Sequence, residues 1–248
     1  MIKHNKGLVS VSFREKSPEE ILVAMKKAKL SHIEWGSDIH APCKDTERLK
    51  ELVRLQDKYG IACCSYGTYF RLGKDDPCEL KAYSDAAKIL GTTILRIWCG
   101  DRNSDSYPES EKKAFLDTAK KTSEIAEKNG VTLCMECHNN TYTETLDGAL
   151  ELMKEVNSPH FQMYWQPNQF RSVDENMAYA RAISPYIKNI HVFNWGGNNK
   201  YPLCEATDVW KRYLSCFDKS LSLLLEFMPD GRIESLDGEA DALYKIIE

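Results

Sequence analysis

Short runs of apolar and β-branched residues alternate with longer amphipathic stretches along the whole chain. Such short runs predict β-strands, and apolar positions at helical spacing between them predict helices. The predicted strands cover 8–13, 32–36, 61–67, 93–100, 132–139, 161–167, 188–195 and 221–227. Successive strands begin 24 to 39 residues apart, which is the spacing of strand–helix units that form a parallel sheet, and is too long for hairpins.

The stretches between the strands carry helix end signals. Ser17 followed by Pro18 is typical of a helix start, and Gly60, Gly91 and Gly130 each follow a helical pattern. The predicted helices cover 17–29, 45–60, 77–91, 108–130, 145–156, 173–184, 207–217 and 237–247. Eight such units without a flexible linker predict an α/β fold with one domain over 1–248, a single (β/α)8 TIM barrel. An open doubly wound sheet is less favoured, because no glycine-rich turn follows the first strand.

Polar residues at the carboxyl ends of the strands are the candidate functional residues, because the active sites of such barrels lie at that end. Along each strand, alternate residues face the barrel interior. This alternation directs Glu136, Gln166, His191 and Glu226 into the barrel and Met135, Trp165, Val192, Leu225 and Phe227 towards the helices. Two carboxylates, an imidazole and an amide are therefore expected to converge from four adjacent strands.

Two buried carboxylates close together require a positive charge nearby. Oxygen and imidazole ligands without a thiolate favour Mn²⁺, Mg²⁺ or Co²⁺ over a structural zinc. The alternative is that Glu136 and Glu226 form ion pairs with Arg96, or with another basic residue inside the barrel. Both interpretations stay open at this level.

Six segments at strand ends resemble those of a known protein family. They are IEWGSDIH, LRIWCG, MECHNN, YWQPN, NIHVFNW and LLLEFM. With these segments the chain resembles the sugar phosphate isomerase/epimerase family, the xylose isomerase-like or endonuclease IV-like TIM barrels, over nearly all of its length. The resemblance implies one divalent metal ion held by Glu136, Gln166, His191 and Glu226, with Mn²⁺ first and Mg²⁺, Co²⁺ or Zn²⁺ as alternatives. Gln166 stands where the family commonly has Asp, so the site carries one negative charge fewer and is expected to bind metal more weakly.

The resemblance also implies an isomerase or epimerase that acts on a ketose or keto-sugar derivative through a cis-enediolate. Glu136 and Glu226 are the expected catalytic residues, which remove and return the proton. The expected substrate-binding residues are His40, Trp98, His138, Asn168 and Trp195. A lyase or hydratase that begins with the same proton abstraction and a non-catalytic sugar-binding homologue are the alternatives.

The charge and the cysteine content limit which partners and which cellular location can be expected. The 33 basic and 37 acidic residues give a net charge of −4 without a basic run, which argues against a nucleic-acid partner such as the DNA of an endonuclease. No apolar segment approaches the ~20 residues of a membrane span. The nine cysteines and the absence of an export signal predict a cytoplasmic protein with reduced thiols. A small carbohydrate is the expected partner, and assembly into a homo-oligomer is left open.

Overall fold

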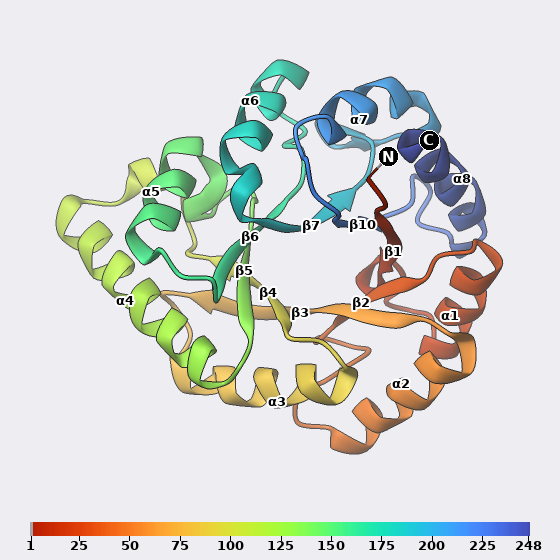
Figure 1. The fold of residues 1–248 in the computed structure, drawn as a ribbon, viewed down its shortest axis with the longest axis horizontal. Helices are drawn as coiled ribbons and strands as arrows, with labels where there is room; N and C mark the ends of the chain where they lie inside the picture. The colour runs from red at the N-terminus through yellow and green to blue at the C-terminus, as the bar shows by residue number, and fades with distance from the viewer. Residues whose placement is uncertain (1) are drawn as a thin grey trace.

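The computed structural model describes residues 2–248 as eight parallel strands closed into a barrel and surrounded by eight helices, so the predicted (β/α)8 TIM barrel is confirmed (Figure 1). The barrel strands are β1 (Asn5–Val9), β2 (His32–Gly36), β3 (Ala62–Leu72), β4 (Ile94–Cys99), β5 (Thr132–Glu136), β6 (Phe161–Trp165), β7 (Ile187–Val192) and β10 (Ser222–Leu225). They follow one another around the barrel, and β10 pairs in parallel with both β7 and β1 to close it.

The helices form where the end signals predict them. They are α1 (Pro18–Lys27), α2 (Thr46–Tyr59), α3 (Leu80–Leu90), α4 (Glu109–Lys128), α5 (Leu146–Val156), α6 (Val173–Ile183), α7 (Thr207–Leu214) and α8 (Leu236–Ile247). Before α1, the Ser17 hydroxyl accepts a hydrogen bond from the Glu20 N–H while the Glu20 carboxylate accepts one from the Ser17 N–H, which satisfies two free donors of the first turn. Gly60 ends α2 in the left-handed conformation with φ 65°.

The first strand differs from its predicted range of 8–13, because β1 ends at Val9 and a 3-10 helix follows over Ser10–Phe13. The Ser10 hydroxyl accepts a hydrogen bond from the Gly36 N–H at 2.9 Å and lies 3.1 Å from His40 Nδ1. These contacts turn the chain onto the loop after β2, so the strand does not continue. The strand also begins at Asn5, earlier than predicted. Gly7 lies in this early part, where a Cβ would lie 2.2 Å from the His32 carbonyl oxygen.

The end of the seventh predicted strand, 188–195, is also different. Strand β7 stops at Val192, and Trp195 belongs to a short antiparallel hairpin of β8 (Trp195–Gly196) and β9 (Asn199–Lys200). Gly197 at its turn has φ 59°, a backbone conformation that glycine adopts at little cost. The hairpin therefore lies directly after a barrel strand at the end where the predicted site is.

The two faces of the strands pack into two different apolar layers, as the alternation predicts. The outer layer, between strands and helices, contains Leu133, Met135, Trp165, Val192 and Leu225. The inner layer contains Val9, Val11, Cys134, Tyr164 and Leu224. Phe227 is an exception and corrects the prediction that it faces the helices, because it packs against the inner layer. Its φ of 53° lies in the left-handed region, which reverses the direction of its side chain relative to simple alternation.

All nine cysteines are free thiols, and four of them, Cys63, Cys99, Cys134 and Cys137, are buried. Cys134 belongs to the inner layer and Cys137 to the outer layer. The two sulfurs of this C-x-x-C sequence therefore point away from each other, as expected on a strand. Within residues 2–248, every helix is too short or too polar to cross a bilayer.

Candidate active site

A cavity of about 270 Å³ opens at the carboxyl end of the barrel. Its lining includes three of the four predicted metal ligands, Glu136, Gln166 and Glu226. The fourth, His191, is fully buried beside them on β7. The strand ends thus bring together all four residues at the floor of one cavity.

Three oxygen atoms surround Nδ1 of His191. Gln166 Oε1 lies 3.0 Å from this nitrogen, Glu226 Oε2 lies at 3.5 Å and Glu136 Oε1 at 3.6 Å. One ligand atom from each of Glu136, His191 and Glu226 lies within 4.8 Å of the others. Ligands at about 2.1 Å from an octahedral cation stand about 3 Å apart, so Glu136, His191 and Glu226 are placed where they could hold a divalent cation, with Gln166 beside His191.

Arg96 on β4 forms the internal ion pair that the sequence left open as an alternative. Its Nη1 donates to Glu136 Oε2 at 2.5 Å, and its Nε donates to Glu34 Oε1 at 2.9 Å. Glu136 thereby uses one oxygen for the guanidinium and turns the other towards His191. The ion pair and the cation site are compatible, because they engage different oxygens of the same carboxylate. Glu226 has no arginine or lysine partner within ion-pair distance among the described residues.

The carboxylates experience different electrostatic surroundings. Burial by itself would raise the pKa of Glu136, but the Arg96 charge keeps this pKa well below the usual range. Burial raises the pKa of Glu226, and the opposing effect of His191 is not sufficient to reverse it. Burial alone would lower the pKa of His191, yet the charge of Glu226 and the contact with Glu136 raise it to about 10. Without a cation, His191 therefore carries the balancing positive charge.

Aromatic side chains form the walls of the cavity. Trp98 packs against His138 with ring centroids 4.4 Å apart, and both line the cavity. Trp195 also lines the cavity, and its ring centroid lies 5.7 Å from that of Phe227. The indole N–H groups of Trp98 and Trp195 are buried without a hydrogen-bond partner among residues 2–248. Three of the five predicted substrate-binding residues thus reach the cavity.

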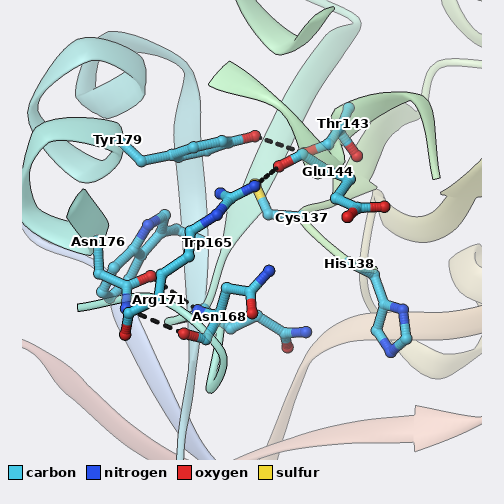
Figure 2. Close-up of a pocket in the computed structure, with 10 residues that line it drawn as sticks. Cys137, His138, Thr143, Glu144, Trp165, Asn168, Arg171, Asn176 and Tyr179 are labelled. Atoms are coloured by element: carbon cyan, nitrogen blue, oxygen red, sulfur yellow. Dashed lines mark hydrogen bonds between the residues drawn. The ribbon is translucent and has the colours of Figure 1, made fainter. Parts of the chain in front are cut away.

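The other two predicted substrate-binding residues lie elsewhere. His40 is 1% exposed, and its ring nitrogens contact the Ser10 hydroxyl and the Lys16 carbonyl oxygen. Asn168 lies in a second cavity of only about 10 Å³, where its backbone N–H donates to the Asn176 side chain at 2.8 Å (Figure 2). The structure therefore gives His40 and Asn168 partners within the protein and does not bring them to the 270 Å³ cavity.

Four residues outside the predicted metal ligands and substrate-binding residues belong to the site or its rim. Glu34 is fully buried next to His191, and Phe227 lines the cavity through its left-handed backbone. Arg14 lines the mouth, where its Nε donates to Asp38 at 2.8 Å. The Lys200 ammonium lies 5.0 Å from the centre of the Phe227 ring. A signal for Glu34 was available, since it stands inside IEWGSDIH on an inward position of β2.

Comparison with known proteins gives related barrels. The chain is 26% identical over 136 residues to a 3-dehydroshikimate dehydratase of Bacillus anthracis, a match that covers 54% of this chain and 48% of that protein. The match thus spans about half the length of that relative. A solved structure of a probable 3-dehydroshikimate dehydratase from the same organism superposes with a TM-score of 0.80 at 16% identity, and the match covers 98% of this chain and 99% of that one.

Two further solved structures share the fold. A xylose isomerase-like TIM barrel protein from Mycobacterium smegmatis in complex with magnesium has a TM-score of 0.72 at 12% identity, covering 99% of this chain and 97% of that one. A D-psicose 3-epimerase from Clostridium cellulolyticum has a TM-score of 0.67 at 14% identity, covering 97% of both chains. At these identities the likeness shows the fold. The family model described as xylose isomerase-like TIM barrel matches residues 22–202. With most of its length matched by that model, the chain belongs to the xylose isomerase-like TIM barrel family.

Proposed function

We propose that the protein is a divalent-metal-dependent isomerase or epimerase that acts on a ketose or keto-sugar derivative. The observation that carries this proposal is the convergence of Glu136, Gln166 and Glu226 on His191 Nδ1 at the floor of the cavity. The solved D-psicose 3-epimerase and the magnesium complex with the same fold support it.

The four residues that would hold the cation are Glu136, Gln166, His191 and Glu226. A donor set of three oxygens and one imidazole nitrogen suits Mn²⁺ best, with Mg²⁺, Co²⁺ and Zn²⁺ as alternatives. When bound, such a cation supplies Lewis-acid polarisation of a carbonyl oxygen, which acidifies the hydrogen on the neighbouring carbon. Arg96 contributes by holding Oε2 of Glu136, so that Oε1 keeps its direction towards the centre.

Glu136 and Glu226 would move the proton. Their nearest oxygens lie 3.6 and 3.5 Å from His191 Nδ1, and both side chains line the cavity. One carboxylate can accept the proton from the substrate carbon while the other, protonated, returns a proton. Return to the same carbon from the opposite face gives epimerisation, and return to the neighbouring carbon gives aldose–ketose isomerisation. The oppositely directed pKa shifts of the two groups agree with one acting as base and the other as acid.

The rest of the cavity suits a small polyhydroxylated molecule. Trp98 and Trp195 offer apolar faces, and their unpartnered indole N–H groups can donate to hydroxyl oxygens. His138 Nδ1 lies 2.8 Å from the Asn139 carbonyl oxygen and donates to it, which leaves Nε2 as the ring nitrogen for a substrate hydroxyl. A cavity of about 270 Å³ has room for one small sugar.

Proton exchange with deuterated water tests this proposal. Mn²⁺-loaded protein should exchange a carbon-bound hydrogen next to the carbonyl of at least one ketose in a panel, as followed by NMR. Glu136→Gln and Glu226→Gln should each exchange far more slowly. Glu239→Gln is the matched control, because Glu239 is a 7% exposed carboxylate on α8 that binds the Leu203 N–H. Equal exchange by Glu136→Gln and the parent, or no exchange with any ketose, would overturn the proposal.

Dehydration of a keto-substrate is the second candidate. The observation that favours it is His138 at the cavity wall, which in its doubly protonated form could give the Nε2 proton to a departing hydroxyl after a carboxylate has removed the neighbouring carbon-bound proton. The likeness to 3-dehydroshikimate dehydratases supports it as well. Mass spectrometry of the turnover products separates the two functions, because isomerisation conserves the substrate mass and dehydration removes one water.

A further inference from the structure

We propose that Glu34 is a positioning residue, which fixes the ring proton of His191 on Nε2 and thereby keeps Nδ1 available to the divalent cation. This inference rests on the proposed metal centre. The expected metal ligands all lie on β5, β6, β7 and β10 or directly after them. Glu34 lies on β2, so the inference gives this further strand a function in the site.

The two ring nitrogens of His191 face different groups. Nδ1 faces the oxygens of Gln166, Glu136 and Glu226, as described above. Nε2 is buried without a hydrogen-bond partner in the described part of the chain, and its nearest carboxylate oxygen is Glu34 Oε1 at 3.7 Å. An imidazole that gives the Nδ1 lone pair to a cation must carry its proton on Nε2, where Glu34 is the acceptor that faces it.

Glu34 is held firmly in this position. Its side chain is fully buried, and its Oε2 accepts hydrogen bonds from the Ser65 hydroxyl at 2.8 Å and the Tyr164 hydroxyl at 2.7 Å. Its Oε1 accepts from Arg96 Nε at 2.9 Å. Three donors therefore surround the carboxylate and favour its charged form, which can accept a further hydrogen bond but cannot donate one.

The backbone leaves space for this group. A Cβ at Gly67 on β3 would lie 2.6 Å from Glu34 Oε1 and 2.8 Å from Arg96 Nη2. A side chain at this position would thus displace the carboxylate or the guanidinium. The Tyr164 hydroxyl is in turn fixed by Asn189 Nδ2, which donates to it at 2.5 Å. Groups from four strands, β3, β4, β6 and β7, thus converge to hold Glu34 next to His191.

A purely structural alternative is that Glu34 only neutralises Arg96. The two roles differ in their consequences. A counter-ion for Arg96 affects folding stability, whereas a positioning residue also determines which nitrogen of His191 carries the proton. The test therefore measures metal affinity and the His191 tautomer together with stability.

Glu34→Gln should lower the affinity for Mn²⁺ by roughly 10–100-fold in calorimetric titrations, the usual effect of removing a group that orients a metal ligand. The new amide can point its NH₂ group at Nε2, which would then become an acceptor and force the proton onto Nδ1. The matched control Glu239→Gln makes the same chemical change on α8 and should leave the Mn²⁺ affinity unchanged. Tyr164→Phe removes one hydrogen bond to Glu34 without removing the charge and should cause a smaller loss than Glu34→Gln.

Nitrogen NMR of ¹⁵N-histidine protein loaded with Mg²⁺ or Zn²⁺ reads the tautomer directly, with the His191 signal assigned by its loss in His191→Asn. The expected signal shows a protonated Nε2 in the unmodified protein. A proton on Nδ1 overturns the inference, as does an Mn²⁺ affinity that Glu34→Gln leaves unchanged. If Glu34→Gln does not fold, the parent tautomer and the affinity of Tyr164→Phe decide. Failure of the parent to bind any divalent cation overturns the proposed function and this inference together, whereas normal binding that is insensitive to Glu34 overturns only the inference.

Discussion

Replacement of Arg96 by methionine should destabilise the metal-free protein strongly. Arg96 is 4% exposed and lies 2.9 Å from Glu34 and 2.5 Å from Glu136, so its removal leaves two buried carboxylates without their partner. Breaking a buried ion pair in this way costs about 3–5 kcal/mol. For a chain of this size that loss corresponds to a decrease of roughly 6–20 °C in Tm.

Urea unfolding at pH 7 in the presence of a chelator measures this loss. Arg212→Met is the matched control, because the Arg212–Asp174 ion pair is exposed, with 53% and 86% of the two side chains accessible. An exposed pair contributes roughly 0.2–1 kcal/mol, so the control should unfold close to the parent. Equal losses for the two variants would refute the conclusion that Arg96 is the counter-ion of the buried carboxylates.

The pH dependence gives a second check on the same variant. Arg96 holds the pKa of Glu136 in the folded protein below its ordinary value of 4.5, against the raising effect of burial. A lowered pKa stabilises the folded state above the ordinary value, and this contribution is lost as the pH falls through the folded value. In Arg96→Met, burial dominates, so the carboxyl group takes up a proton more readily. The stability difference between parent and variant should therefore be largest near neutral pH and shrink below pH 4.5.

Three further predictions concern the cavity and its cation. Phe227→Gly should be more stable than Phe227→Ala by about 1 kcal/mol in urea unfolding, because the backbone at φ 53° favours glycine while both variants lose the ring; equal stability would contradict the left-handed backbone. Mn²⁺ at 100 times its Kd should stabilise the folded protein by about 2.7 kcal/mol. Chelation should therefore lower Tm by roughly 5–10 °C in a thermal melt. A Tm that does not change on chelation would argue against a specific site. Gln166→Asp adds a fourth carboxylate to the centre, so the variant should bind Mn²⁺ more tightly in calorimetry and its chelated form should have a lower Tm than the chelated parent. Weaker binding would show that residue 166 is not a ligand.

The elements of the fold could be predicted because local signals and tertiary structure agree. The capping box at Ser17 and the left-handed glycine at Gly60 lie where the helix patterns begin and end. Strand alternation correctly assigned the inward positions of Glu136 and His191, because on β5 and β7 one face meets the helix layer and the other the barrel interior. Residues whose positions depend on periodicity alone were therefore placed correctly.

Residues whose positions depend on contacts with distant parts of the sequence were not predicted correctly. The strand at β1 was shifted because Ser10 bonds to the Gly36 backbone, a contact that no local pattern encodes. Phe227 breaks the alternation through a single left-handed residue. His40 follows a strand end as a ligand-binding residue would, yet its side chain turns into the protein towards Ser10 and Lys16.

The charge of the proposed centre is consistent with a neutral amide at position 166. Glu34, Glu136 and Glu226 contribute three negative charges and Arg96 one positive charge, which leaves two negative charges around a His191 that would be neutral once Nδ1 binds a cation. A divalent cation would balance this sum, whereas an aspartate at position 166 would leave one negative charge uncompensated in a buried site. Because Glu34 is part of this balance, the neutral amide of Gln166 fits the proposed divalent centre, which has three carboxylates and one arginine. The sequence showed the missing carboxylate after β6 but not the additional one on β2, so the expectation of weaker metal binding did not take Glu34 into account.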